Sequence, residues 1–247
     1  MIVVGAGTKG EGLGNGKAVA IQFAREGANV LCVDRDRSSV EMTAEAILKE
    51  RGRAEVSVAD IVIEKDCERV VDQCLTVFKK VDVLHNNVGI VTLKEIVKTT
   101  GEEWTKAFDV NIKGMFFMCK HTIPRMIEGG GGSIINVSSM ASLRSYPDAA
   151  YVSSKGAVNS LTFYIAGRYA RYNIRANALL LGYIDTPLAR QAWGDKRVQD
   201  INLRQVPMRR LASPWEVATV AAFLASDESS YVTGVILPVD GGLSLHL

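Results

Sequence analysis

Tyr151 and Lys155 are the two residues of this 247-residue chain whose types and spacing are best suited to chemistry. They lie four positions apart at the start of a segment, 153–172, with a helical pattern, so both side chains are expected on one helix face. A nearby ammonium group favours a phenolate and lowers a tyrosine pKa from about 10. Tyr151 is therefore a candidate general acid and base. Alone the pair is weak evidence, because most such pairs only cover a helix surface.

A glycine-rich loop near the N-terminus stands among the elements of a nucleotide-binding unit. The apolar run 1–4 leads into glycines at 5, 7, 10, 12, 14 and 16, a helix is expected over 17–26, and the apolar run 29–33 ends at Asp34. In this order, the glycines admit a pyrophosphate to the backbone, the helix N-terminus attracts its charge, and the acid binds ribose hydroxyls. The unit predicts a dinucleotide cofactor.

Apolar runs alternate with helical patterns along the rest of the chain. Further strands are expected over 54–58, 81–85, 133–137, 174–181 and 235–239, and helices over 38–51, 64–79, 101–128 and 153–172. Nearly continuous Val, Ile and Leu strands between helices predict a mostly parallel, doubly wound α/β sheet covered on both faces. Ligands bind at the carboxyl ends of such strands. The polar or glycine residues expected there are Asp34, Asp60, Asn87, Ser139 and Gly182.

Composition and charge narrow the function classes. A hydrophobic content of 47% supports a sizeable core, and the lack of a linker or repeat favours a single domain over 1–247. The net charge is +2, from 29 basic and 27 acidic residues that are well mixed, so neither nucleic acid nor a membrane is an expected partner. The scattered cysteines and histidines predict no metal site and no disulfide framework. Without a signal-peptide pattern or a long apolar stretch, the chain is expected to be cytoplasmic.

Taken together, the motifs resemble the short-chain dehydrogenase/reductase family over essentially the whole chain. No single motif carries the resemblance, but their order and spacing agree. The matching features are the glycine loop, Asp34, Asp60, the sequence 86–89, Asn111, Ser139, Tyr151 with Lys155, the segment 182–186, and the C-terminal motifs at 207–218 and 239–242.

This resemblance implies an oxidoreductase that transfers hydride between NAD and a secondary alcohol or its ketone. Tyr151 would exchange the hydroxyl proton, and Lys155 would lower the Tyr151 pKa and bind the nicotinamide ribose. Ser139 would bind the substrate oxygen, and Asn111 would fix a water beside Lys155. The implied cofactor contacts, with no metal, are Gly5, Thr8, Gly14, Asn15, Asp34, Asp60, Asn87, Gly89, Tyr151, Lys155, Ile184 and Thr186.

Four features depart from the family pattern. The glycine loop is longer by roughly residues Lys9 to Leu13, which places the later glycine pair at Gly14 and Gly16 and leaves the loop contacts with the cofactor open. Val4 replaces a threonine, and Leu181 replaces a proline. The segment before Tyr151 is one residue short, so Ser138 competes with Ser139 for the catalytic position. We favour Ser139, because position relative to the strand end sets the side-chain direction.

The cofactor and the reaction class each have an alternative. Asp34 should repel a 2′-phosphate and so favours NAD, whereas Arg35 and Lys9 could neutralise that phosphate. An NADP-dependent ketoreductase of the same family is therefore the main alternative. A non-catalytic nucleotide-sensing protein is a second one, because a fold does not determine a function. A sugar-nucleotide epimerase or dehydratase is disfavoured by the short segment after Thr186.

Substrate and assembly are less strongly indicated. Stretches 90–96, 140–149 and 187–206 should form the pocket, with 187–210 as a substrate lid. Arg144 and the lid cations Arg190, Lys196, Arg197 and Arg204, set against Asp195 and Asp200, are compatible with a polar and even an anionic substrate, although solvated lid charges explain most of them better. A homotetramer, with a dimer as the alternative, is predicted from apolar residues on helices 104–126 and 153–172, namely Phe108, Phe116, Phe117, Leu161, Phe163 and Tyr164.

Overall fold

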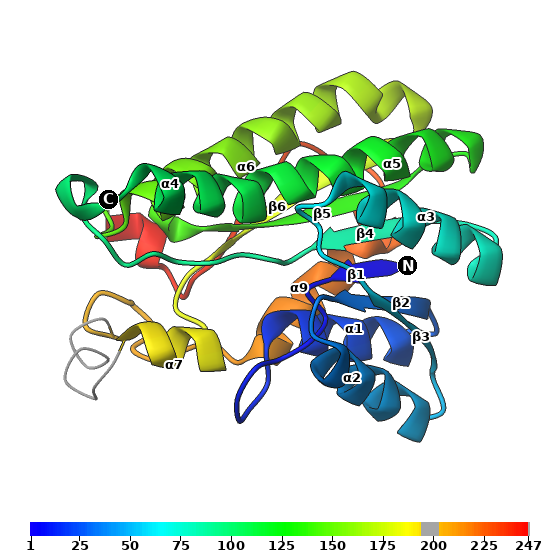
Figure 1. Cartoon of the computed structure of the whole chain (residues 1–247), viewed down its shortest axis with the longest axis horizontal. Helices are drawn as coiled ribbons and strands as arrows, with labels where there is room; N and C mark the ends of the chain where they lie inside the picture. Colours follow the sequence, from blue (N-terminus) through cyan, green and yellow to red (C-terminus); the bar gives the residue numbers. More distant parts are fainter. Residues whose placement is uncertain (194–202, 247) are drawn as a thin grey trace.

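The computed structural model describes residues 1–193 and 203–246, and within them seven parallel strands form one sheet (Figure 1). The strand order is β3-β2-β1-β4-β5-β6-β7. The first three strands are added in one direction across the sheet and the last four in the other, so the order reverses between β1 and β4. This confirms the predicted doubly wound parallel sheet. The strands are β1 (Ile2–Val4), β2 (Asn29–Asp34), β3 (Arg53–Val58), β4 (Val83–Asn86), β5 (Gly132–Ser139), β6 (Ile174–Leu181) and β7 (Ile236–Val239).

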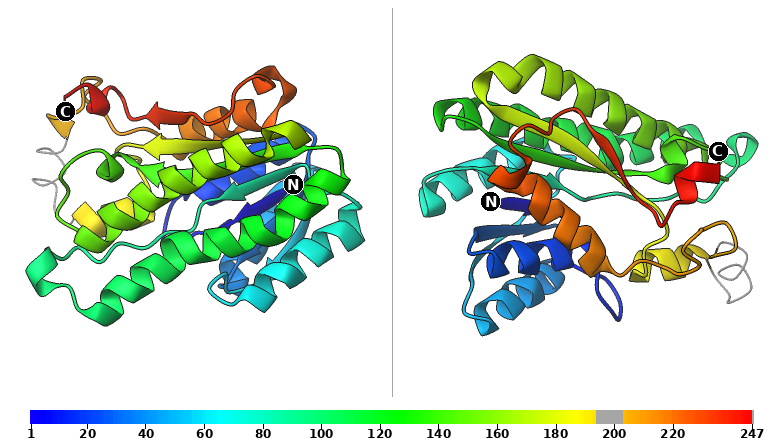
Figure 2. Two further views of the ribbon diagram at one scale, coloured as in Figure 1. Left: turned by 90° about the horizontal axis from the view of Figure 1, so that it is seen from above. Right: turned by 180° about the vertical axis from the view of Figure 1, so that it is seen from behind.

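Helices cover both faces of the sheet (Figures 1 and 2). One face carries α1 (Asn15–Arg25), α2 (Arg37–Lys49) and α9 (Pro214–Ala225). The other carries α3 (Glu64–Phe78), α4 (Gly101–Phe108), α5 (Gly114–Glu128) and α6 (Ala149–Tyr169). The short helix α7 (Pro187–Trp193) lies beyond the carboxyl ends of the strands (Figure 1). No helix in these described residues is long and apolar enough to cross a membrane.

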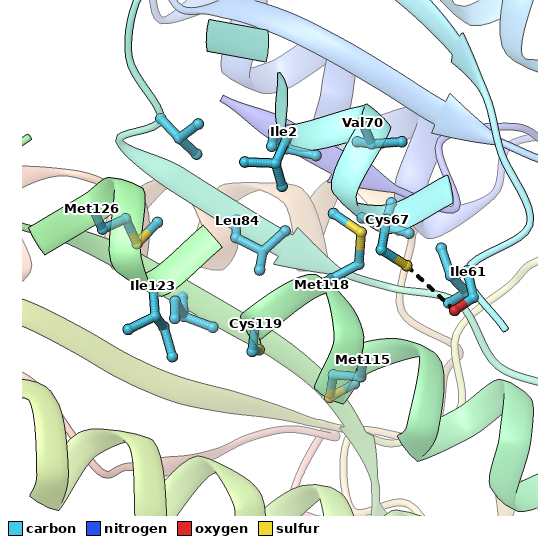
Figure 3. Close-up of a cluster of buried hydrophobic side chains, with 14 of the residues drawn as sticks. Ile2, Ile61, Cys67, Val70, Leu84, Met115, Met118, Cys119, Ile123 and Met126 are labelled. Carbon is cyan, nitrogen blue, oxygen red and sulfur yellow. Dashed lines mark hydrogen bonds between the residues drawn. The ribbon is translucent and has the colours of Figure 1, made fainter. Parts of the chain in front are cut away.

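Apolar side chains fill the space between the sheet and each helix layer. Beneath α3 and α5, Ile2 and Leu84 of the two central strands pack with Val70 and Met118, and all four side chains are fully buried (Figure 3). The Cys67 thiol in the same cluster donates to the Ile61 carbonyl at 3.3 Å, and all four cysteines are buried and free. This close packing fixes the positions of β1 and β4, and so fixes the starting points of the loops at their carboxyl ends.

Two predicted helices differ from the structure in ways that bear on function. The long helix expected over 101–128 is interrupted at Asp109–Lys113 by a π-helical turn that contains Asn111. Such a turn leaves no mark in apolar periodicity, and it is frequent at functional sites. The helix expected to begin at 153 begins at Ala149, because the Asp148 side chain accepts a hydrogen bond from the Tyr151 N–H and caps it.

His85 is an ionisable residue in the middle of β4 that takes no part in the site. It is 0% exposed, and both of its ring nitrogens are buried without a hydrogen-bond partner. The ring lies edge-on to Phe23, with 6.1 Å between centroids. Burial lowers the pKa of His85 from 6.5 to about 3, so the imidazole is neutral in the folded protein.

We therefore predict that His85 destabilises the fold in acid. Between the unfolded pKa of 6.5 and the folded value of about 3, the unfolded chain binds one more proton than the native protein, so stability falls as pH falls. The slope is about 1.4 kcal/mol per pH unit. Urea unfolding at pH 7.5, 6 and 5 should show this contribution in the wild type and its loss in His85→Leu. His121→Gln serves as the control and should retain it, and parallel pH curves for wild type and His85→Leu would contradict the prediction.

Candidate active site

A cavity of about 740 Å³ runs along the carboxyl ends of the strands, between the glycine loop and α7. Asp34 and Asp60 lie in its lining near one end of the sheet, and Ser139, Tyr151 and Lys155 belong to the strand and helix on the other side. Every catalytic and cofactor-binding residue that the resemblance implied lines this cavity, with the exception of Asn111, which is fully buried behind it. The sheet thus brings together residues that are more than a hundred positions apart in the chain.

Ser139 and Ser138 face in different directions at the end of β5. The Ser139 side chain hydrogen-bonds the Tyr151 hydroxyl, and its Oγ accepts from the Ala141 N–H at 3.2 Å. The Ser138 hydroxyl, 1% exposed, instead donates to the Lys155 backbone carbonyl at 3.3 Å. Because neighbouring strand residues alternate between faces, only one serine can meet Tyr151. The geometry therefore favours Ser139.

Burial controls the protonation of Tyr151 and Lys155. It raises the pKa of Tyr151 to about 12, with smaller contributions in the same direction from Tyr146 and Asp148 and an opposing one from Ser139. The expectation that Lys155 lowers the Tyr151 pKa is wrong for this structure. The Lys155 ammonium donates to the Val137 carbonyl at 2.8 Å and lies 5.7 Å from the centroid of the Tyr151 ring, and burial lowers its own pKa to about 8. At neutral pH, Tyr151 carries its proton.

Asn111 ties the loop after β4 to α6. Its Oδ1 accepts from the Ile90 N–H at 2.8 Å, and its Nδ2 donates to the Ile90 carbonyl at 3.0 Å and to the Ser154 hydroxyl at 2.9 Å. Gly89 lies between Asn111 and Lys155, because a Cβ there would be 3.6 Å from Asn111 Oδ1 and 3.2 Å from Lys155 Nζ. The water expected between Asn111 and Lys155 stays a prediction.

The glycine loop brings α1 into direct contact with the end of β1. A Cβ on Gly16 would lie only 1.9 Å from the Gly5 carbonyl oxygen, so this position requires glycine and Gly16 belongs to the close-packed pair. Gly14 is the N-cap of α1 and offers no side chain to its first amides, while Asn15 Oδ1 is buried without a partner. Free amides at a helix N-terminus and an unpaired buried acceptor suit an anionic, hydroxyl-bearing ligand such as a dinucleotide.

The carboxylate of Asp34 is fixed at the end of β2. Its Oδ2 accepts from the Gly7 N–H at 3.0 Å and its Oδ1 from the Asp36 N–H at 3.1 Å, which also ties the glycine loop to β2. Lys9 and Arg35 line the same part of the cavity and are exposed.

The additional residues of the glycine loop lie next to α7. Gly10 and Gly12 have φ angles of 82° and 117°, which favour glycine. A Cβ on Gly10 would lie 3.7 Å from Pro187, and one on Gly12 would lie 3.5 Å from the Arg190 guanidinium. At the base of the loop, the Thr8 hydroxyl accepts from the Gly14 N–H at 3.1 Å. The longer loop therefore reaches from the cofactor end of the cavity to the first turn of α7.

Arg144 is a cation that lines the cavity together with Tyr146, Tyr183 and Gln205, at what we call the substrate end. Its Nη2 donates to Gln205 Oε1 at 3.1 Å, and its Nη1 is buried without a hydrogen-bond partner. Arg190 is instead bound by Asp185 at 2.7 and 3.0 Å, and Arg204 is exposed. Lys196, Arg197, Asp195, Asp200 and the 194–202 part of the expected lid lie outside the described residues.

Tyr146, Tyr183 and Gln205 also line the cavity. They fall within stretches that the sequence analysis assigned to the pocket or to a family motif, but nothing in their local sequence distinguished them individually from ordinary loop residues. Asp148 was missed although a signal was available, since an acid directly before an apolar helical run is a common N-cap.

Comparison with known proteins extends these observations to the whole chain. A family model described as enoyl-(acyl carrier protein) reductase matches residues 11–244. A 3-oxoacyl-(acyl-carrier-protein) reductase of Thermotoga maritima is 35% identical over 235 residues, which cover 95% of this chain and 95% of that protein. An NAD-dependent glycerol dehydrogenase of Listeria innocua is 34% identical over 96% of this chain and 92% of its own length. A solved structure described as a short-chain dehydrogenase/reductase of Burkholderia xenovorans has a TM-score of 0.95 and 33% identity, with 99% of this chain and 95% of that chain covered.

Proposed function

We propose that this chain, which belongs to the short-chain dehydrogenase/reductase family of oxidoreductases, transfers hydride between NAD(H) and a secondary alcohol or its ketone, with Tyr151 as general acid and base. The observation that carries the proposal is the Ser139–Tyr151–Lys155 group in the cavity wall, where a protonated phenol lies beside a buried ammonium group. A non-catalytic nucleotide sensor would have no need for a phenol and an ammonium kept together in a buried wall.

The cavity end formed by the glycine loop is the place for the cofactor. Gly14 and Asn15 at the N-terminus of α1 would hold the pyrophosphate, Asp34 the adenosine ribose, and Asp60 the neighbouring base. The remaining cofactor contacts are proposed at Gly5, Thr8, Asn87, Gly89, Ile184 and Thr186, together with Tyr151 and Lys155. A bound nicotinamide supplies or accepts the hydride, which no side chain of the chain can do.

The side chains of the protein transfer the proton and bind the substrate oxygen. Ser139 donates a hydrogen bond to that oxygen, and Tyr151 gives it a proton in reduction or removes one in oxidation. Because the pKa of Tyr151 is about 12, the residue is ready to act as the acid at neutral pH. Because the pKa of Lys155 is about 8, its positive charge is present at neutral pH and is lost above that value.

Substitution of Tyr151 tests the proposed proton transfer. Tyr151→Phe should lower kcat for ketone reduction at least about a hundredfold, since general acid catalysis contributes about 10²–10⁴-fold. NADH affinity, measured by calorimetry, should stay close to that of the wild type, because the ring remains. Ser139→Ala should also lower kcat, whereas Ser138→Ala is the control and should not, because its hydroxyl bonds the Lys155 carbonyl. Turnover by Tyr151→Phe within tenfold of the wild type would exclude this role.

NAD is the proposed cofactor because Asp34 is held rigidly where a 2′-phosphate would lie. Its hydrogen bonds to the Gly7 and Asp36 amides prevent it from turning away. Lys9 and Arg35 are exposed, flexible cations that stay solvated at little cost. The Listeria innocua relative is described as NAD-dependent, which supports the same choice.

We predict a preference for NAD over NADP of at least about a hundredfold in kcat/KM, roughly 2.7 kcal/mol. Asp34→Ala should reduce this ratio mainly by improving NADP, because Arg35 can then approach the phosphate. Steady-state kinetics with both cofactors provide the measurement. If the unmodified enzyme used both cofactors equally, Asp34 would not face the ribose.

An anionic group on the substrate is proposed from Arg144. Its unpaired Nη1 and its position in the cavity suit a carboxylate, sulfonate or phosphate. Arg144→Ala should lower kcat/KM for keto acids by about tenfold or more, the loss of one charged hydrogen bond, and leave neutral ketones unaffected. Arg204→Ala is the exposed control. Equal turnover of keto acids and matched neutral ketones, unchanged by Arg144→Ala, would remove this part of the proposal.

A homotetramer is proposed from the outer surface of α5 and α6. Phe116, Phe163 and Tyr164 are 46%, 53% and 60% exposed there, whereas Phe117 and Leu161 pack against the core. Exposed aromatic groups on neighbouring helices usually mark an interface. Light scattering at micromolar concentration should give a tetramer mass, and a monomer mass would contradict it.

A cytoplasmic location is proposed as well, in keeping with four free, buried thiols.

A further inference from the structure

Asp148 is a buried carboxylate between the substrate end of the cavity and α6. It is 0% exposed and directly precedes the helix that carries Tyr151. Its Oδ2 accepts from the N–H groups of Thr92 and Leu93 at 2.6 and 2.7 Å. Its Oδ1 accepts from the Thr92 hydroxyl at 2.6 Å and from the Tyr151 N–H at 3.0 Å. One side chain thus binds both the loop after β4 and the first turn of α6.

The loop held by Asp148 has a strained backbone. Leu93 has a φ of 56°, in the left-handed region, and its side chain lines the cavity. A non-glycine residue in this conformation costs of the order of 1 kcal/mol and persists only when its surroundings hold it. The short bond from the Leu93 N–H to Asp148 provides that hold, and the Ala149 N–H adds a bond to the Lys94 carbonyl at 3.3 Å.

We propose that Asp148 is a positioning residue for the reaction, which fixes the Tyr151 hydroxyl and the cavity-lining loop 92–94 relative to each other. The inference rests on the proposed role of Tyr151. A displacement of about 1 Å between acid and substrate is enough to slow a reaction, so a residue that holds the two walls of the cavity together acts on kcat. Its buried position means that Asp148 acts through Thr92, Leu93 and Tyr151.

The charge of Asp148 also acts on the Tyr151 phenol. Among the groups that face the phenol, burial apart, Tyr146 and Asp148 raise its pKa and the Ser139 hydrogen bond lowers it. The Lys155 ammonium lies 5.7 Å from the ring centroid. Removing the negative charge at 148 should therefore make Tyr151 easier to deprotonate, a consequence that a purely structural helix cap would not have.

Asp148→Asn keeps the size of the side chain and removes its charge and one acceptor. It should lower kcat at least tenfold, leave NADH affinity within twofold of wild type, and move the alkaline rise of alcohol oxidation to lower pH. Hydrogen exchange should show that the amides of Thr92, Leu93 and Tyr151 lose protection. Ser213→Ala is the matched control, because it removes the N-cap of the remote helix α9 and should change stability without moving the pH profile.

Thr92→Val provides a second variant in case Asp148→Asn does not fold. It removes a single hydroxyl donor, and it should lower kcat about threefold or more with unchanged NADH affinity. The inference is overturned if the variant that folds keeps wild-type kcat, pH profile and amide protection. If the wild-type protein turns over no alcohol or ketone, the proposed function fails instead, and the exchange data alone then decide whether Asp148 holds the loop to α6.

Discussion

The hydrogen bond between the buried amides of Asn86 and Asn136 is the interaction on which the arrangement of the site depends. Asn86 Nδ2 donates to Asn136 Oδ1 at 2.9 Å, and Asn136 Nδ2 donates to the Thr162 hydroxyl of α6 at 3.0 Å. The bonds join β4, β5 and α6 where all three residues are at most 2% exposed. In such an apolar setting an unpaired amide N–H group is costly, and although Asn86 Oδ1 has no partner, the pairing of both Nδ2 groups favours this register.

That register aligns the functional residues at the ends of the strands. Val4, Asn86, Asn136 and Ala178 lie in one row across four parallel strands. Because the strands are parallel, the residues that follow each of these four in the chain lie toward the same edge of the sheet. Gly5 and Asn87 meet there directly, with Asn87 Nδ2 donating to the Gly5 carbonyl at 3.1 Å. A slip of one residue in β5 would turn Ser138 rather than Ser139 toward Tyr151.

Burial decides the electrostatics of the site more than the charges do. Tyr151 and Lys155 are close in sequence and in space, yet the phenol keeps its proton and the pKa of the ammonium falls to about 8. Desolvation opposes the charged form of both groups and is the largest cause of both shifts. The same low dielectric strengthens the bonds to Asp148 and Asn111, which tie the loop after β4 to α6.

The sequence by itself determined the sheet, the glycine loop, and which polar residues end the strands, because these depend on local apolar patterns and on glycine's lack of a Cβ. The catalytic and cofactor-binding residues expected from the sequence therefore line the cavity, apart from the buried Asn111. Tertiary structure decided what local patterns do not encode. The π-helical turn at Asn111 is one such feature. The hydrogen bonds from Thr92 and Leu93 to Asp148, and the approach of Gly10 and Gly12 to α7, join segments that lie far apart in the chain. The pKa of Tyr151 belongs to this second group, because desolvation depends on how the whole chain packs around the phenol.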